Sequence, residues 1–247
     1  MRDAGRIVAE ALGHVKAMAA PGVTTAEMDQ AVARTFQKYN AVPLFRGYPN
    51  STQGKPAFPA VICASVNEAV VHGIPNHRPL TEGDVVSVDT GCLYEGWCGD
   101  SAITVAIGRV SPEVQHLLDV TAQTLDLAIS AMTRCKTWYD VAALMERFVH
   151  SQNMFVIEKF VGHGIGQKMH EEPQVPNFVS KALKKKNILL EPGLVLAIEP
   201  MVALGTKNVE TLNDHWTVVT KDRRASAHFE HTVAMTPDGP QVLTLPA

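Results

Sequence analysis

The stretch V-V-S-V-D-T-G-C-L-Y-E-G-W-C-G-D-S-A-I-T-V-A-I, residues 85–107, contains two apolar runs that each carry an aspartate. The runs 85–89 and 97–107 flank a turn that contains glycine, which predicts a β-hairpin. Asp89 ends the first strand and Asp100 lies in the second. Residues on paired strands can face each other at roughly 5 Å between Cβ atoms. We therefore expect both carboxylates to bind one pair of metal ions, which in such sites lie ~3.5–4 Å apart.

Two glutamates and a histidine extend this pair to five potential metal ligands. Glu199 ends the run L-V-L-A-I-E-P, Glu230 sits mid-strand in A-H-F-E-H-T-V-A-M, and His163 lies between glycines in G-H-G-I-G. An unpaired carboxylate on a buried strand is very costly, and these strands contain no Lys or Arg. Two divalent cations would balance the four negative charges beside a neutral imidazole. The sequence therefore predicts a two-metal hydrolase site formed by Asp89, Asp100, His163, Glu199 and Glu230.

Several of these residues have a plainer interpretation when each is taken alone. Asp89, followed by T-G, would serve equally well as a turn residue at the end of a strand. His163 would be an incidental residue of a flexible glycine loop. His228 is expected on the same strand face as Glu230, where it either lies beside the metal ligands or is exposed at a sheet edge.

Length, composition and charge are those of an ordinary globular protein. The chain has 247 residues, 46% of them hydrophobic and 19% charged, which is enough for a sizeable core. The net charge of −3 favours neither nucleic acid nor a membrane surface, and the basic cluster 181–186 is interpreted as a solvated face. No signal peptide or membrane-spanning run is expected. Four cysteines without C-x-x-C spacing, among them Cys92 and Cys98 as free thiols, predict a reducing, cytoplasmic location.

Periodicity and capping signals predict two helices followed by strands in each half of the chain, about 1–110 and 111–247. The helices are expected at 2–20, after the capping box Thr24–Glu27, after Ser111-Pro112, and from Thr137 to about His150. Strands are predicted at 61–66, 85–89, 97–107, 156–161, 194–199, 216–220, 227–235 and 241–245. Residues 46–60 are rich in Gly and Pro and are expected to form a loop. Because both halves supply ligands, the site is expected between them.

Seven ordered motifs give the whole chain a resemblance to a known enzyme family. They are N-E-A-V-V-H-G-I-P (67–75), V-D-T-G (88–91) with G-D-S (99–101), G-H-G-I-G (162–166), H-E-E-P-Q-V (170–175), I-E-P-M-V (198–202), W-T-V-V-T-K-D (216–222) and F-E-H-T-V (229–233). In these motifs the chain resembles type I methionine aminopeptidases. The resemblance implies a single catalytic domain, 1–247, with the α+β pita-bread fold: two pseudo-symmetric halves around a central antiparallel sheet, with helices outside.

The resemblance also implies a role for each metal ligand. Asp100 and Glu230 would bridge two divalent ions, Asp89 would chelate one of them, and His163 and Glu199 would complete the other. The ions are expected to be Co, Mn, Fe or Zn, because one imidazole and four carboxylates suit all of these metals. The resemblance also implies a monovalent cation near Asn67 and Ser226.

The same resemblance implies the chemistry and the substrate. Metal-activated water would attack the first peptide bond, with Glu199 taking its proton, His170 stabilising the oxyanion and His72 contacting the scissile amide. The methionine pocket would consist of Phe45, Tyr48, Cys63 and Trp216. Aromatic rings and a thiol suit a thioether side chain.

Four features depart from the usual pattern of the family. Val71 stands where a Cys is common, Met169 where an aromatic residue is common, and His228 where a Gln is frequent, while residues 50–60 resemble an insertion. None of these changes removes a metal ligand. Met169 and the insertion are expected to alter the detailed shape of the methionine pocket.

The expected partners are the N-termini of nascent polypeptides at the ribosome. Substrates with a small second residue are expected to be preferred. The enzyme is expected to be a monomer. Two alternatives use the same fold. One is an Xaa-Pro-type peptidase, which generally carries an additional N-terminal domain. The other is a peptide-binding module that has lost its metals, against which the intact ligand set argues.

Overall fold

The structure is a computed structural model that describes residues 1–246. Its helices are α1 (Arg2–Met18), α2 (Thr25–Lys38), α3 (Pro112–Ala131), α4 (Trp138–Ser151) and α5 (Lys181–Lys185). Its strands are β1 (Val42–Pro43), β2 (Cys63–Val66), β3 (Ala69–Val71), β4 (Val85–Tyr94), β5 (Trp97–Ala106), β6 (Phe155–Val156), β7 (Gly162–Gly164), β8 (Glu171–Val175), β9 (Val195–Ile198), β10 (Met201–Ala203), β11 (Val209–Thr211), β12 (Val218–Thr220), β13 (Ser226–His228), β14 (His231–Thr236) and β15 (Gly239–Val242). All strand pairs described are antiparallel, so the predicted α+β class is confirmed.

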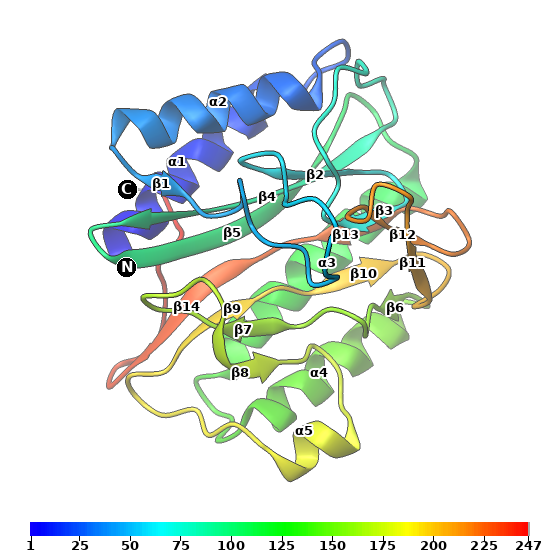
Figure 1. Ribbon diagram of the computed structural model, residues 1–247. Helices are drawn as coiled ribbons and strands as arrows, with labels where there is room; N and C mark the ends of the chain where they lie inside the picture. The colour runs from blue at the N-terminus through cyan, green and yellow to red at the C-terminus, as the bar shows by residue number, and fades with distance from the viewer. Residues whose placement is uncertain (247) are drawn as a thin grey trace.

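The long helices cover the strands in two groups. Helix α1 packs on β4 and β5, whereas α3 and α4 pack on β6, β10 and β13 (Figure 1). The predicted helix starts are confirmed: Thr24 and Glu27 form both bonds of a capping box, and Ser111 accepts a bond from the amide of Val114. At α4 the Thr137 hydroxyl donates to Asp140 at 2.7 Å and caps no backbone amide.

The β4–β5 hairpin is longer than predicted, and this changes the position of Asp89. The turn consists of Glu95 and Gly96, both with positive φ (49° and 81°), as a two-residue hairpin turn requires. Strand β4 continues to Tyr94, so the interpretation of Asp89 as a turn residue at a strand end is wrong. Asp89 pairs with Ala102, two positions from Asp100 on β5. Both carboxylates therefore lie on the same face of the hairpin.

The predicted strand 227–235 is broken, and the prediction of Glu230 in mid-strand is wrong. Strand β13 pairs with β10, whereas β14 pairs with β9. Between them Glu230 forms an isolated bridge to β5, where its amide donates to the Ala102 carbonyl at 2.9 Å. The chain changes partner at this residue, so one strand cannot continue through it. The change of partner places the Glu230 carboxylate beside the hairpin.

Several other strands are shorter than predicted because their backbone amides find other partners or none. Residues 61 and 62 donate to the Asp29 carboxylate at 2.7 and 3.0 Å, so β2 begins at residue 63. Asp214 accepts from the amides of residues 216 and 217, so β12 begins at Val218. Strand β6 ends at Val156, although the Ile157 amide still donates to the Met201 carbonyl at 2.9 Å; one residue further, the partner segment has Pro200, which has no N–H. Strands β9 and β15 overlap the predicted 194–199 and 241–245.

The two groups of elements are joined at the site of the predicted ligands. Phe36 of α2 is fully buried in one core, and Trp138 of α4 is fully buried in another. Between these cores, the Thr232 hydroxyl of β14 donates to the Asp100 carbonyl at 2.8 Å and accepts from its amide at 3.3 Å. The backbone of a ligand-bearing strand is thus fixed across the junction.

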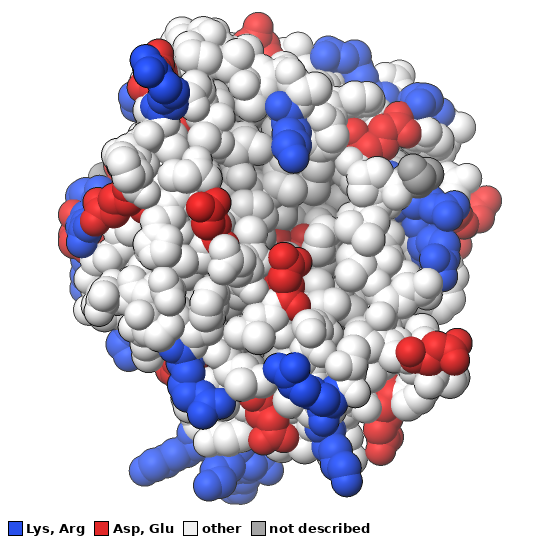
Figure 2. Space-filling view, turned by 180° about the vertical axis from the view of Figure 1, so that it is seen from behind, with Lys and Arg blue, Asp and Glu red and all other residues white. Residues whose placement is uncertain are grey.

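The surface carries charges of both signs. In Figure 2 basic and acidic side chains both occur around the rim of a largely uncharged face, and basic side chains gather at its lower edge, where α5 lies in Figure 1. The lysines of 181–186 are exposed while Leu183 is buried, which confirms a solvated helix face. Among the described residues no helix is both long and apolar enough to cross a membrane. All four cysteines are free, as predicted for Cys92 and Cys98.

Candidate metal centre and substrate pocket

A cavity of about 570 Å³ opens where the two groups of strands meet. All the residues predicted for metal binding, catalysis and the methionine pocket line it: Asp89, Asp100, His163, Glu199, Glu230, His72, His170, Phe45, Tyr48, Cys63 and Trp216. The two residues predicted for a monovalent cation are not among its lining residues. Asn67 instead donates to Asp84 at 2.8 Å, and Ser226 donates to the Ala69 carbonyl at 3.1 Å.

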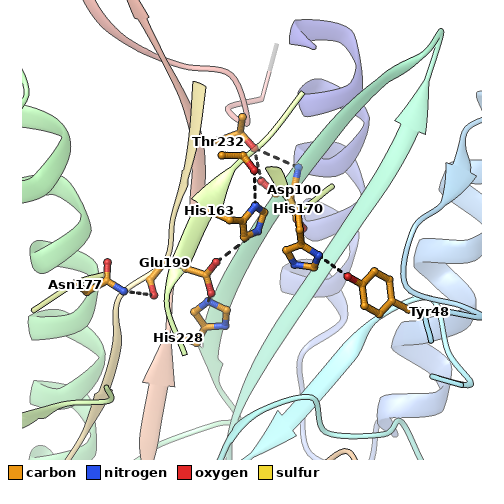
Figure 3. Close-up of polar contacts among 9 residues, drawn as sticks. Tyr48, Asp100, His163, His170, Asn177, Glu199, His228 and Thr232 are labelled. Atoms are coloured by element: carbon orange, nitrogen blue, oxygen red, sulfur yellow. Dashed lines mark hydrogen bonds and ion pairs between the residues drawn. The ribbon is translucent and has the colours of Figure 1, made fainter. Parts of the chain in front are cut away.

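Three of the predicted ligands form a tight group at the base of the cavity. Asp100, His163 and Glu230 each offer one ligand atom within 4.8 Å of the others. Glu199 follows β9, and its Oε1 lies 3.6 Å from His163 Nε2 (Figure 3). His163 Nδ1 lies 2.9 Å from the carbonyl of Gly164, a contact that requires the proton on Nδ1. His163 Nε2 is then the nitrogen available for a metal.

Buried oxygens without partners show that this group suits a divalent cation. Asp89 Oδ1, Asp100 Oδ1 and Glu230 Oε1 are each buried and have no hydrogen-bond donor among the described residues. Leaving a buried acceptor unsatisfied costs about 1–3 kcal/mol, and more when it is charged. No lysine or arginine forms an ion pair with these carboxylates in the described chain. Carboxylates with one imidazole are ligands for Mn, Fe, Co or Zn, so the residues present fit the predicted metals.

The pKa values of the carboxylates reflect the same uncompensated burial. Desolvation raises the pKa of Asp100 to about 7. Desolvation, with repulsion from Asp100, raises the pKa values of Asp89, Glu199 and Glu230 well above their usual range. Burial lowers the pKa of His163 to about 4, so its imidazole is neutral at pH 7. Metal binding at this site must therefore release protons.

We expect the metal-free protein to lose thermal stability as the pH rises from about 4 to about 7. The pKa of Asp100 is about 7 in the folded chain, against 3.8 for a free aspartate, so folding favours its protonated form. This contribution is complete below the unfolded pKa and is lost as the pH rises through the folded one. Calorimetry of chelated protein at pH 5 and pH 8 measures the effect. An equal loss of stability in the Mn-loaded protein would contradict this origin, because bound cations stabilise the ionised carboxylates.

The two predicted catalytic histidines both line the cavity. His72 follows β3 with a positive φ of 60°, packs edge-on against Phe160 at 5.2 Å, and has its pKa lowered by burial to about 4. The His170 ring lies 4.3 Å from the His163 ring, and its Nδ1 is 2.7 Å from the Tyr48 hydroxyl (Figure 3). Burial lowers the pKa of His170 too. Both histidines are therefore neutral groups that line the cavity.

One side of the cavity is apolar, and it contains a residue that the sequence analysis missed. Phe58 is buried and meets the ring of Trp216 edge-on at 5.2 Å between centroids. Phe45, Cys63 and Met169 are buried in the same cluster. Phe58 is the only large apolar residue besides Tyr48 in the Gly- and Pro-rich segment 46–60, and this was the available signal. Met169 contributes a thioether to this side, at the position where the family resemblance led us to expect an aromatic ring.

His228 is buried beside Glu199, so the interpretation as an exposed edge residue is wrong. It is 2% exposed, and its Nε2 has no hydrogen-bond partner. This nitrogen lies 3.9 Å from Glu199 Oε2, on the opposite side from His163 (Figure 3). The carbonyl of Glu199 accepts a bond from Asn177 at 3.0 Å. Glu199 is thus enclosed by groups that can orient both of its carboxylate oxygens.

His228→Leu is expected to weaken metal binding by about 10–100-fold, the usual loss when a partner of a metal ligand is removed. The reason is that the Glu199 Oε2 oxygen would lose the imidazole nitrogen that lies 3.9 Å from it. His228→Gln keeps an N–H group and serves as the matched control, with affinity close to that of the parent. Calorimetric titration with Mn measures both variants. Equal affinities for the leucine and glutamine variants would exclude this role.

Comparison with known proteins agrees with the geometry. The model of a family described as "Metallopeptidase family M24" matches residues 1–237. A methionine aminopeptidase from Clostridium acetobutylicum is 44% identical over 99% of this chain and 94% of its own length, and methionine aminopeptidase 1 from Bacillus subtilis is 42% identical with the same coverage. The crystal structure of a methionine aminopeptidase from Thermotoga maritima superposes with a TM-score of 0.92 at 38% identity, covering 99% of this chain and 95% of that one.

The site and these matches define the class of protein, and the chain belongs to metallopeptidase family M24. Within that family, the relatives at this level of identity are methionine aminopeptidases, and their structures confirm the pita-bread fold predicted from the sequence. An Xaa-Pro dipeptidase from Bacillus anthracis shares only the fold, with a TM-score of 0.68 at 19% identity. This chain covers 59% of that protein.

Proposed function

We propose that this chain removes the N-terminal methionine from polypeptides by hydrolysis of the first peptide bond. The observation that supports it most directly is the position of one apolar wall beside one carboxylate cluster in a single cavity. The cluster would provide the hydrolytic chemistry, and the wall would select the first side chain. The identity of the relatives makes the Xaa-Pro and metal-free alternatives the less favoured ones.

Five residues would hold two divalent cations, with Asp100 and Glu230 touching both. Asp89 would bind one cation, while His163 and Glu199 would bind the other. When bound, such ions polarise the substrate carbonyl and provide a nucleophile at neutral pH. Glu199 would accept the proton of the attacking water, because its carboxylate lines the cavity beside the other ligands.

The two histidines would act on the substrate itself. His170 would donate a hydrogen bond to the oxyanion that develops at the scissile carbonyl. His72 would contact the scissile amide and assist departure of the amine. Because burial lowers the pKa of both imidazoles, they would act as neutral hydrogen-bonding groups and would not compete with the cations for the carboxylates.

The monovalent cation implied near Asn67 and Ser226 is retained as a proposal with a restricted ligand set. The Asn67 amide oxygen already accepts from the Val85 amide at 3.0 Å, and the Ser226 hydroxyl already donates to a carbonyl. Backbone carbonyl oxygens, which have two lone pairs, would therefore have to provide most of the coordination.

The physiological substrates would be nascent polypeptides, processed at the ribosome in the cytoplasm by a monomeric enzyme. A small second residue would be favoured, because the cavity of about 570 Å³ has to hold part of the following chain as well as the first side chain. The metal would be Co, Mn, Fe or Zn, and availability as well as affinity would decide among them.

Peptide selectivity tests this function. With one metal throughout, kcat/KM is expected to be highest for Met-Ala-Ser, lower for Leu-Ala-Ser and much lower for Met-Lys-Ser. An unbranched thioether fits the apolar wall, and a long charged second residue must be desolvated. An acetylated Met-Ala-Ser peptide is the control and should not be cleaved, because the site is expected to require a free amine. Faster cleavage of Ala-Pro-Ser than of Met-Ala-Ser would replace this proposal with the Xaa-Pro alternative.

A further inference from the structure

Residues 48–58, here called the strap, form a compact loop beside the apolar side of the cavity. Its ends are held together because the Phe58 amide donates to the Tyr48 carbonyl at 2.9 Å and the Gly47 amide donates to the Phe58 carbonyl at 2.8 Å. Such a closed loop is an Ω-loop, a form frequently used for function. Inside it, the Asn50 side-chain oxygen accepts from the Thr52 amide at 2.9 Å. The strap is therefore a folded unit with its own turn.

The strap is bonded to a second segment that lies far from it in sequence. The Asn50 side-chain N–H donates to the His215 carbonyl at 3.0 Å, and Trp216 Nε1 donates to the Pro56 carbonyl at 3.0 Å. The receiving segment is itself rigid, because the Asp214 carboxylate accepts from two following amides and from a hydroxyl. Two cross-links thus join the strap to the turn that carries Trp216.

These cross-links act on the residues that face the proposed methionine side chain. Phe58, at one end of the strap, and Trp216, bonded to Pro56 near the same end, form the edge-on aromatic pair of the apolar side. At the other end Tyr48 is bonded to His170. Residues 49–51 and His215 are exposed or half-buried and line the same cavity. The strap therefore connects the rings beside the first side chain with a histidine beside the scissile bond.

We propose that the strap sets the first-residue selectivity of this chain by fixing the Phe58 and Trp216 rings relative to each other through its bonds to residues 215 and 216. This inference rests on the proposed function. A wall fixed in this way rejects a bulkier apolar side chain, because making room would require breaking the cross-links. A loose wall would adapt to leucine or phenylalanine.

Asn50 offers a variant that separates the cross-link from the local turn. Asn50→Asp keeps the oxygen that accepts from the Thr52 amide and removes the N–H that reaches His215. Asn50→Ala removes both. Lys55→Ala is the matched control, since this exposed side chain forms no bond in the described chain. Deletion of residues 51–55 removes the strap's outer part, and the point variants keep the proposal testable if the deleted chain does not fold.

The measurement is the ratio of kcat/KM for Met-Ala-Ser to that for Phe-Ala-Ser. This ratio is expected to fall about tenfold in Asn50→Asp and Asn50→Ala, within the range that a pocket of this kind discriminates, and further in the deletion variant. Lys55→Ala should leave it unchanged. The proposal is overturned if a folded variant of either Asn50 type keeps the parent ratio while cleaving Met-Ala-Ser. If the ratio fell in Asn50→Ala but not in Asn50→Asp, the effect would come from the local turn, and the proposal would also be overturned.

A second readout is independent of peptidase activity. Trp138 is fully buried, whereas Trp97 is 43% exposed, so in a Trp97→Phe background acrylamide quenching reports mainly on Trp216. Quenching is expected to increase in Asn50→Asp and not in Lys55→Ala, because the wall loosens. If the chain cleaved no methionine peptide, the proposed function would fail. Unchanged quenching in Asn50→Asp would show separately that the strap does not hold the Phe58 and Trp216 rings in place.

Discussion

Chelation of divalent cations is expected to abolish peptidase activity, and added Mn, Co or Fe is expected to restore it. The physical reason is the set of buried carboxylates with unpartnered oxygens, which no Lys or Arg compensates within the described chain. Removal of the cations leaves these groups protonated or mutually repelling, so the base and the nucleophile are lost together. Metal content measured alongside kcat should follow activity during the titration. Full activity after exhaustive demetallation would refute the two-metal proposal.

Asp100→Asn should lower activity more than Asp89→Asn. Asp100 belongs to the tight group with His163 and Glu230 and would touch both cations, whereas Asp89 would touch one. Asp100→Asn should therefore retain less metal than Asp89→Asn, which elemental analysis of the purified proteins measures. Asp119→Asn is the control, because this exposed carboxylate on α3 bonds only to Gln115. Equal metal loss in both site variants would contradict the bridging role of Asp100.

The parts of the site that were predictable from sequence depend on local backbone geometry. The β4–β5 hairpin is specified by a two-residue turn and by alternating strand residues, so the shared face of Asp89 and Asp100 follows from register alone. The capping box at Thr24 is equally local. The catalytic roles of His72 and His170 were predicted only from the family motifs, because residue spacing and periodicity do not indicate a role for either histidine.

The features that escaped prediction depend on contacts between distant segments. The break at Glu230 arises because its amide pairs with Ala102, more than a hundred residues earlier in the chain. The position of Phe58 in the apolar wall depends on the folding of the strap against Trp216. No periodicity within either segment contains that information, because each is decided by tertiary pairing. His228 was expected beside Glu230 on one strand face; both line the cavity although the strand is broken between them, and the burial of His228 was left open for the same reason.

His170→Ala is expected to retain both metals while lowering kcat by about 10²–10³, the typical loss of one oxyanion-stabilising donor. His170 is not in the tight ligand group, and its Nδ1 is engaged by the Tyr48 hydroxyl at 2.7 Å. If the hydroxyl donates in this bond, the ring carries its proton on Nε2. That N–H is the donor available to a developing oxyanion, whereas the same nitrogen would have to be unprotonated to bind a metal.

Tyr48→Phe separates this role from metal binding. The variant keeps the ring that packs edge-on against His170 at 5.4 Å but lacks the hydroxyl that fixes the tautomer. Its kcat should lie between those of the parent and of His170→Ala, with the metal content of both variants unchanged. Loss of metal in proportion to activity in His170→Ala would make His170 a ligand. In that case the cluster would have two imidazoles, and the oxyanion would need another donor.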